Sequence, residues 1–397
     1  MKKLIATLLC VLMAVTAFGC AATPAAEPAA PATEPAAAPT EAPAAEPATE
    51  PAATTGGDTI YVLGPTPDHG WTAQAGAYAE RKVEAINAEG KWKATYMSAS
   101  TGEEQVDQVQ TILANGNAAG VVFFALEDSA KAGQEALIAE GIPFISFDRI
   151  IEGPDKYAIL NASGDNWQCG AGIAYWLEQK GMVPGSTLVT LIGDNGTVCT
   201  RRQEGFEQYL MGEMEYSDKH TGQTYKVANP WTKEQVDALC ADYKQVCNWS
   251  ADGAYGYLEQ KLPEIIGAAK ANDGNLFIFS QDDEMTFGML NLIEANALDD
   301  ATKADLEALN VYISAIGGMA ELYAVMDGTS AQAATAATYF DDMMSVYFSP
   351  KMMENVIGYM LDYLAGDWSY EVGTGKYEPV WIVDANNVSE YEGFTGH

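Results

Sequence analysis

The chain has 397 residues and a formal net charge of −34 at pH 7, because 55 Asp and Glu residues stand against only 21 Lys and Arg. No Lys or Arg occurs between Lys3 and Arg81, and the composition excludes a nucleic-acid-binding or anionic-lipid-binding role that depends on clustered cations. Residues 58–397 are too many for one small core and predict two domains of ordinary size.

The first twenty residues, MKKLIATLLCVLMAVTAFGC, predict an export signal, because a basic start and a short apolar run precede small residues and a cysteine. The ending AFGC resembles the bacterial lipobox, which implies that Cys20 becomes a lipidated N-terminus anchoring an extracytoplasmic protein to the cell membrane. An ordinary signal peptide with a chance cysteine is the alternative. Residues 21–57, nearly all Ala, Pro, Glu and Thr, predict an extended tether with a reach on the order of 100 Å.

The next part of the chain alternates short apolar runs with segments of helical periodicity. The predicted strands are 59–64, 93–99, 118–126 and 143–147, and the predicted helices are 72–89, 103–116 and 130–141. Such a βαβ series is right-handed and predicts a parallel sheet with helices on both of its faces.

After residues 157–166 the same alternation of predicted strands and helices starts again. The predicted strands are 186–193, 224–230, 275–280 and 310–317, and the predicted helices are 167–181, 201–212, 254–271 and 284–295. Two extended segments, 343–350 and 376–384, flank a last helix at 351–366. Two similar sheets built in succession predict an α/β protein of two lobes, with a cleft between their carboxyl edges.

Four short motifs, which follow one another along the chain in the same order as in a known family, carry a family resemblance. SFDRII (146–151) is similar to the Asp-Arg strand end of the ribose and xylose receptors, and RRQEGFEQYL (201–210) to their Arg-x-Glu-Gly-Phe helix start. FSQDDEMTFGML (279–290) is similar to a Gln-Asn-Asp-Glu-Met-Ala-x-Gly signature, and MMSVYFSP (343–350) to a crossing segment of the xylose protein. From Asp58 onward the chain resembles the type I periplasmic sugar-binding proteins of ATP-driven transporters, the ribose, xylose and galactose group.

The resemblance implies two Rossmann-like parallel-sheet lobes, 58–162 with 347–377 and 163–346 with 378–397, joined by a hinge of three strands near Ala162, Tyr347 and Pro379. It also implies a monomeric receptor that binds a monosaccharide or related polyol and delivers it to an ABC permease, without a cofactor. A sensory protein that presents ligand to a membrane receptor and a secreted carbohydrate-active hydrolase are the alternatives. An enzyme is not expected, because GxSxG, HExxH and GxxxxGK[ST] motifs do not occur in the sequence.

Hydroxyl-rich ligands need carboxylates, guanidinium groups and flat aromatic faces, and such residues stand at predicted strand ends. Asp148 and Arg149 follow the strand 143–147 and are predicted to hold hydroxyls while partly neutralising each other; a structural ion pair is the alternative. By the resemblance, Asp68 and the stacking Trp71 would contact ligand from the loop after the first strand. His69 of the same loop could assist, and a simply solvated histidine is the alternative. Trp71 as a core residue of the following helix is the alternative.

The second lobe supplies further candidates by the same resemblance. Arg202 is expected at a cleft edge as a donor, with Arg201 as the alternative register, and mutation of Asp148 or Arg202 is expected to abolish binding with little loss of folding. Trp249 is a second stacking face or a surface aromatic. Asp282 is expected to accept from hydroxyls and Asp283 to cap the next helix, since Asp is a favoured N-cap. Asp165 and Asn166 either contact the ligand or cap a helix.

Other features depart from the family or stay open. Gly317 and Gly318 stand where ribose and galactose proteins carry an acidic residue, which Glu321 could replace, so the identity of the sugar stays open. The spacing in 248–259 approaches an EF-hand but with too few carboxylates for a good calcium site, and no spacing resembles a zinc site. Cys240 and Cys247 are close enough in sequence for a local disulfide. The alternative is four buried free thiols at Cys169, Cys199, Cys240 and Cys247.

Overall fold

The computed structural model describes residues 56–66 and 70–395. The predicted export signal with Cys20, nearly all of the predicted tether, and the candidates Asp68 and His69 lie outside the described residues. Within the described ranges, no helix has both the length and the apolar character that crossing a membrane requires.

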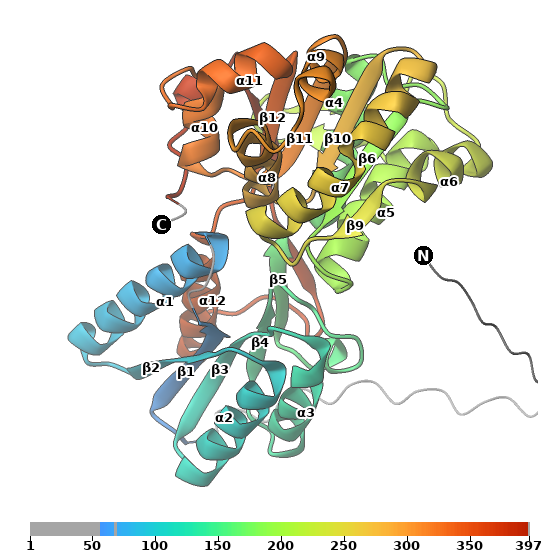
Figure 1. Ribbon diagram of the computed structural model, residues 1–397. Coiled ribbons are helices and arrows are strands. Elements are labelled where there is room, and N and C mark those ends of the chain that lie inside the picture. The colour runs from blue at the N-terminus through green and yellow to red at the C-terminus, as the bar shows by residue number, and fades with distance from the viewer. Residues whose placement is uncertain (1–55, 67–69, 396–397) are drawn as a thin grey trace, which may run out of the picture. The chain divides into compact units, whose positions relative to one another are not determined.

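The first lobe is built on an all-parallel sheet in the order β13-β5-β4-β3-β1-β2 (Figure 1). Its strands are β1 (Thr59–Pro65), β2 (Lys93–Ala99), β3 (Ala118–Phe124), β4 (Phe144–Phe147), β5 (Leu160–Gly164) and β13 (Gly375–Glu378). Strands β1 and β3 are buried along their whole length, as expected for apolar runs covered on both faces.

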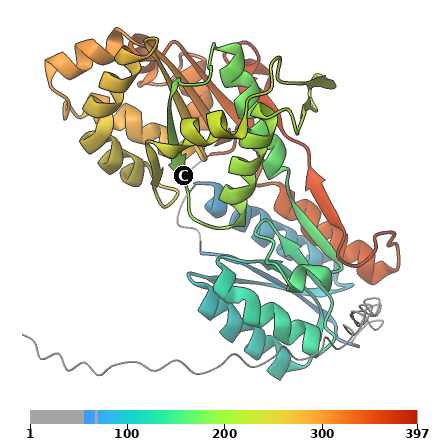
Figure 2. The same cartoon turned by 90° about the vertical axis from the view of Figure 1, so that its right-hand side faces the viewer.

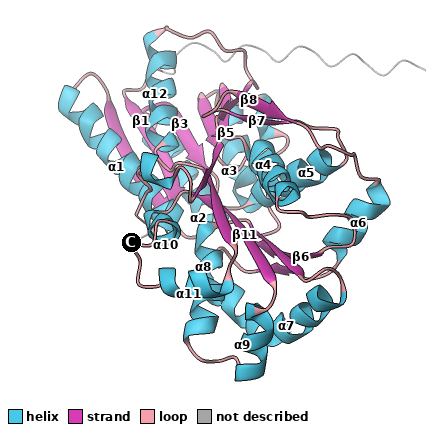
Figure 3. Cartoon of the chain, turned by 90° about the horizontal axis from the view of Figure 1, so that it is seen from above, coloured by secondary structure: helices cyan, strands magenta, loops and turns pink. Residues whose placement is uncertain are grey.

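Helices cover both faces of this sheet, which confirms the predicted architecture (Figure 3). One face packs against α1 (Gly70–Glu89) and α12 (Met352–Ala365), and the other against α2 (Gly102–Asn115) and α3 (Lys131–Ala139). Alternation along β1 explains the division, because Ile60 and Val62 contact the first pair of helices whereas Tyr61 and Leu63 contact the second.

The second lobe is built on the sheet β14-β12-β11-β10-β6-β9, in which β14 alone is antiparallel to its neighbour. Its strands are β6 (Thr187–Ile192), β9 (Lys244–Val246), β10 (Asn275–Ser280), β11 (Asn310–Gly317), β12 (Asp342–Tyr347) and β14 (Trp381–Asp384). The surrounding helices are α4 (Asn166–Gln179), α5 (Thr197–Leu210), α6 (Lys233–Ala241), α7 (Ala251–Ala271), α8 (Asp283–Glu294), α9 (Asp300–Glu307), α10 (Ala320–Met326) and α11 (Ala333–Tyr339).

One predicted strand of this sheet is wrong. The segment 224–230 does not join the main sheet; its start forms β8 (Gln223–Tyr225), which pairs only with β7 (Tyr216–Asp218) as an antiparallel hairpin. Aromatic packing holds the hairpin against α4, since the rings of Tyr225 and Tyr175 stack with centroids 4.2 Å apart. The edge position is taken by β9.

The chain passes between the two sheets three times, as the resemblance implies (Figures 1 and 2). The crossings follow β5, follow β12, and separate β13 from β14 at Pro379 and Val380. The segment 376–384, predicted as one extended piece, is therefore two strands in different sheets. Proline at the break is favourable because it has no N–H to donate to a ladder.

Two open questions from the sequence are answered in the body. The cysteines Cys169, Cys199, Cys240 and Cys247 are all free thiols. The EF-hand-like segment 248–259 is no calcium loop, because α7 begins at Ala251 and runs through its second half.

Candidate functional site

A cavity of about 250 Å³ lies between the carboxyl ends of the two sheets. Most of its walls come from residues at or just after strand ends, which is where ligands bind in parallel α/β sheets. The residues that line it include Trp71, Thr72, Phe124, Glu127, Asp148, Arg149, Asp194, Arg202, Asn248, Trp249, Asp282, Gly317 and Phe348.

The cavity brings together Trp71, Asp148, Arg149, Arg202, Trp249 and Asp282 of the predicted ligand residues. Asp165 and Asn166 do not line it. Asp165 is the N-cap of α4 and accepts from the backbone N–H of Gln168 at 3.1 Å, so its capping alternative is the one observed.

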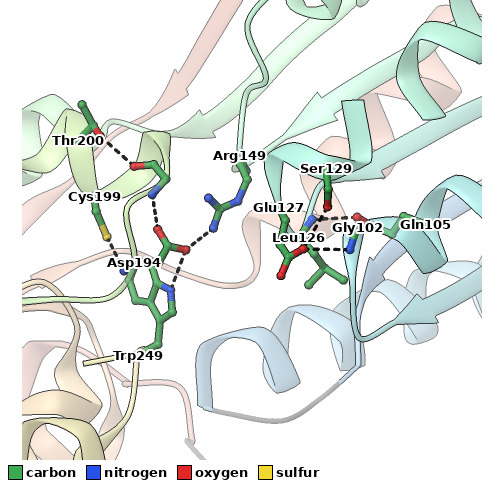
Figure 4. Close-up of polar contacts among 11 residues, drawn as sticks. Gly102, Gln105, Leu126, Glu127, Ser129, Arg149, Asp194, Cys199, Thr200 and Trp249 are labelled. Carbon is green, nitrogen blue, oxygen red and sulfur yellow. Dashed lines mark hydrogen bonds and ion pairs between the residues drawn. The ribbon is translucent and has the colours of Figure 1, made fainter. Parts of the chain in front are cut away.

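An ion pair joins the two lobes at one side of the cavity (Figure 4). Arg149 follows β4, and its Nη2 donates to Oδ2 of Asp194, which follows β6, at 2.6 Å. Burial raises the pKa of Asp194, but the charge of Arg149 and the hydrogen bonds that Asp194 accepts from Arg149, the Gly196 N–H and Trp249 outweigh burial and hold that pKa below its ordinary value. Arg149 therefore forms its ion pair with Asp194 rather than with its neighbour Asp148.

Asp148 adopts a left-handed backbone conformation, with φ of 61°. Asp tolerates this region better than most residues. Its backbone N–H donates to the Ala162 carbonyl at 2.9 Å, which ties it to β5, and its side chain opens onto the cavity. Burial raises the pKa of this carboxyl, while the guanidinium groups of Arg202 and Arg149 act in the opposite direction.

Arg202 is the arginine of α5 that reaches the cavity, whereas Arg201 lies over the ring of Trp167 at 4.5 Å. Arg202 is only 4% exposed. Its Nε donates to Oδ1 of Asn166 at 2.9 Å and its Nη1 donates to the Gln281 carbonyl. The expected position at a cleft edge is thus corrected: Arg202 is a buried cation, and Asn166 holds it in place.

Aromatic rings flank the Arg202 guanidinium on two sides. Its Cζ lies 5.6 Å from the ring centroid of Trp249 and 5.0 Å from that of Phe348. Trp249 and the preceding Asn248 both have positive φ, 57° and 53°, which strains the turn before α7. The indole Nε1 of Trp249 donates to Oδ2 of Asp194 at 3.1 Å, so the aromatic wall and the ion pair are joined.

Trp71 lies in the first turn of α1, because that helix begins at Gly70, earlier than predicted. It is 8% exposed, and its Nε1 donates to the Phe348 carbonyl at 2.7 Å. Its ring packs against Phe124, Phe147 and Phe348. Trp71 is therefore both a core residue of this helix, the alternative considered from the sequence, and part of the cavity wall.

The N-cap of α8 is Asp282 rather than Asp283, so the capping role predicted for Asp283 is wrong. Asp282 is the N-cap, accepting from the Glu284 N–H at 2.8 Å while also lining the cavity. Burial, and next the charge of Asp283, raise the pKa of Asp282 well above its ordinary value. A one-residue ambiguity of this kind is common for helix starts.

Asp283 instead fastens the end of β11. Its Oδ2 accepts from the N–H groups of Gly318 at 2.6 Å and Met319 at 2.7 Å, and its Oδ1 from the Ser345 hydroxyl at 2.7 Å. A Cβ at Gly317 would lie 2.8 Å from that Oδ2, so glycine there lets the carboxylate approach. Burial raises the pKa of Asp283 to about 6. Glu321, the expected substitute at this strand end, lines a separate cavity.

Sequence reasoning missed several residues that line the cavity: Phe124, Glu127, Asp194, Asn248 and Phe348. Asp194 and Glu127 could have been found, because each follows a buried strand within three residues, the same signal that singled out Asp148. Glu127 stands at the exposed rim, where it accepts from the Ser129 hydroxyl at 3.1 Å (Figure 4).

The chemistry of the cavity suits a small ligand with many hydroxyls. Two guanidinium groups donate, three aspartates accept, and aromatic rings offer flat apolar faces. Among the described residues, no group of three or more His, Cys, Asp or Glu side chains is placed to hold a metal ion.

Comparisons with known proteins identify a family and a fold. A family model described as a periplasmic binding protein domain matches residues 60–366. A search of curated proteins by sequence finds no match.

Several solved structures are similar in fold. The periplasmic binding protein component of the arabinose ABC transporter from Shewanella sp. ANA-3, bound to α- and β-L-arabinofuranose, is 16% identical, with a TM-score of 0.59 and coverage of 84% of this chain and 93% of its own. A galactofuranose binding protein is 18% identical, with a TM-score of 0.59 and coverage of 84% and 96%. An ABC transporter solute binding protein from Bacillus halodurans C-125 with bound myo-inositol is 16% identical, with a TM-score of 0.59 and coverage of 85% and 98%.

Proposed function

Because the chain belongs to the family of periplasmic binding protein domains, we propose that it is a solute receptor that binds one monosaccharide or related polyol between its lobes. The observation that carries this proposal is the cavity itself, where Arg149, Arg202, Asp148 and Asp282 meet aromatic rings at the carboxyl ends of both sheets. This is the combination that a neutral ligand with hydroxyls and C–H faces requires. Similar folds that hold arabinofuranose and myo-inositol support the same class of ligand.

The proposed ligand residues divide between direct contact and support. The ligand contacts are Trp71, Asp148, Arg149, Arg202, Trp249 and Asp282, together with Asp68 and His69, which precede α1 in the sequence. Asp194 and Asn166 orient Arg149 and Arg202 through the hydrogen bonds described above. The receptor carries out no catalysis and needs no cofactor.

Ligand binding acts by shifting the population between open and closed forms. The proposed lobes are 58–162 with 347–377 and 163–346 with 378–397, and a ligand that touches both makes more contacts when they are closed, so it favours the closed form. The closed monomer then delivers its ligand to an ABC permease. Export by residues 1–20, lipidation of Cys20 and the tether 21–57 would keep the receptor near that permease at the membrane surface.

A thermal-shift screen tests the ligand class. The chain is heated alone and with L-arabinose, D-galactose, D-ribose, D-glucose or myo-inositol, and a true ligand at 100 times its Kd stabilises the folded form by about 2.7 kcal/mol. We expect one compound to raise the midpoint in the wild-type chain and to lose that effect in Asp148→Asn, which keeps the shape of the side chain. The proposal is refuted if no sugar or polyol moves the midpoint.

A further inference from the structure

A second contact between the lobes lies at the start of α1, beside the cavity. The backbone N–H of Gly70, the first residue of α1, donates to Oε1 of Glu284 at 2.7 Å. Gly70 belongs to the first lobe and Glu284 to the first turn of α8 in the second lobe. Glu284 does not line the cavity, although Trp71 and Thr72, which follow Gly70, do.

The chemistry of this contact follows from how helices begin. The first N–H groups of a helix have no partner within it, and the backbone dipoles place partial positive charge at that end. The first turn of α1 contains no acidic residue of its own. Glu284 supplies the missing acceptor from the opposite lobe, and its charge also lies at the start of α8, where the same dipole effect is favourable.

A second hydrogen bond supports the same face of α1. Gln74 lies one turn after Gly70, and its Nε2 donates to Oγ1 of Thr395 at 3.3 Å. The neighbouring Phe394 is held by the second lobe, since its N–H donates to the Gly318 carbonyl at 3.0 Å and its carbonyl accepts from Ala320. The two contacts give α1 a docking face on the second lobe.

We propose that Glu284 is a positioning residue that latches the lobes in their closed arrangement without touching ligand. The inference rests on the proposed receptor function. By fixing Gly70, Glu284 also fixes where Trp71 and Thr72 meet the cavity. Opening the lobes would separate the carboxylate from the N–H, so the latch raises the closed fraction, and apparent affinity scales with the fraction that is competent to bind.

The test compares Glu284→Ala and Glu284→Gln with the wild-type full chain, without ligand. Hydrogen exchange is followed in a peptide covering residues 70–79, and small-angle scattering gives the radius of gyration. Losing a charge-assisted hydrogen bond is expected to speed exchange about ten- to a hundredfold in the alanine variant, with an increased radius of gyration. The glutamine variant should be intermediate, because its amide oxygen still accepts. The matched control is Glu259→Gln, at an exposed glutamate of α7, which should behave like wild type.

Two outcomes overturn the latch. In the first, Glu284→Ala exchanges at the wild-type rate. In the second, exchange rises while the radius of gyration stays unchanged, which would make Glu284 only a local cap. Both measurements are made without ligand, so they stand apart from the sugar screen. If the latch test fails and the sugar screen is positive, the proposed receptor function still stands. If the latch test succeeds and no sugar shifts the midpoint, only the proposed ligand class is removed.

Discussion

Replacing Arg202 tests whether the buried cation supports the fold as well as the ligand. Its guanidinium is 4% exposed and makes two hydrogen bonds within the second lobe, to Asn166 and to the Gln281 carbonyl. Arg202→Ala would leave both acceptors buried without this donor, and would remove the positive charge that Asp148 and Asp282 face.

The expected cost is large for a site residue. Hydrogen bonds to charged groups contribute about 1.5–3 kcal/mol each, and removing one partner from a buried charged network costs about 3–5 kcal/mol. A loss of that size lowers Tm by about 6–15 °C in a protein of this size. The expectation from sequence, that this substitution would spare folding, is therefore replaced.

Thermal unfolding followed by circular dichroism measures this cost in the ligand-free chain. The matched control is Arg201→Ala, which removes the same charge one residue earlier but breaks only a partly exposed contact with Trp167, worth about 1 kcal/mol or less. The reasoning is refuted if Arg202→Ala and Arg201→Ala unfold within about 2 °C of each other.

Two further predictions concern residues that support the cavity from behind its walls. The native chain binds the proton of Asp283 more tightly than the unfolded chain, since burial raises the pKa of this carboxyl to about 6, above its ordinary value of 3.8. As the pH rises from 4 to 6, the contribution of Asp283 to the free energy of unfolding therefore falls by up to roughly 3 kcal/mol, and it is constant above pH 6. Asp283→Asn should remove that part of the pH dependence in urea unfolding, and equal slopes for variant and wild type would contradict it. A Cβ at Gly193 would lie 2.2 Å from the Trp249 ring, so Gly193→Ala should displace the indole from Asp194 and lower the free energy of unfolding by about 1–3 kcal/mol. The control is Gly256→Ala, where an added Cβ has no atom within 4 Å. If Gly193→Ala and the control have the same Tm, the Trp249 ring moves aside without a cost in stability, which contradicts the prediction.

Much of the fold could be predicted because its strands are buried on both faces. Strands β1 and β3 were placed to within two residues, because a continuous apolar run between two helical segments is typical of a strand buried on both faces. The bounds of β2 were also predicted, although that strand is only partly buried. Strand β9 was missed because it is a short edge strand of polar character, Lys244–Val246, without an apolar run to mark it. The segment 224–230 was misplaced because its β-forming residues pair equally well with a local hairpin.

The site was predictable in its parts but not in its connections. Strand ends identified Asp148 and Arg149, yet the partner of Arg149 is Asp194, from the other lobe, 45 residues away. Two neighbouring aspartates, Asp282 and Asp283, are equally suited by residue type to cap α8. The backbone conformation at the start of the helix decides that Asp282 is the cap, and the sequence does not show that conformation. The inward direction of Arg202 depends on its acceptors in α4 and after β10, which only the packed structure brings together.

The division of the last strands between the two sheets has a consequence for biosynthesis. Strand β13 completes one sheet and β14 the other, and Asn161 bonds the Gly373 carbonyl across 212 residues of sequence. A chain that emerges from its N-terminal end therefore exposes β5 and β12 as unpaired edges until its last segment arrives. Both lobes are completed at the same late moment, and a product cut short before residue 375 would carry two aggregation-prone edges rather than one finished lobe.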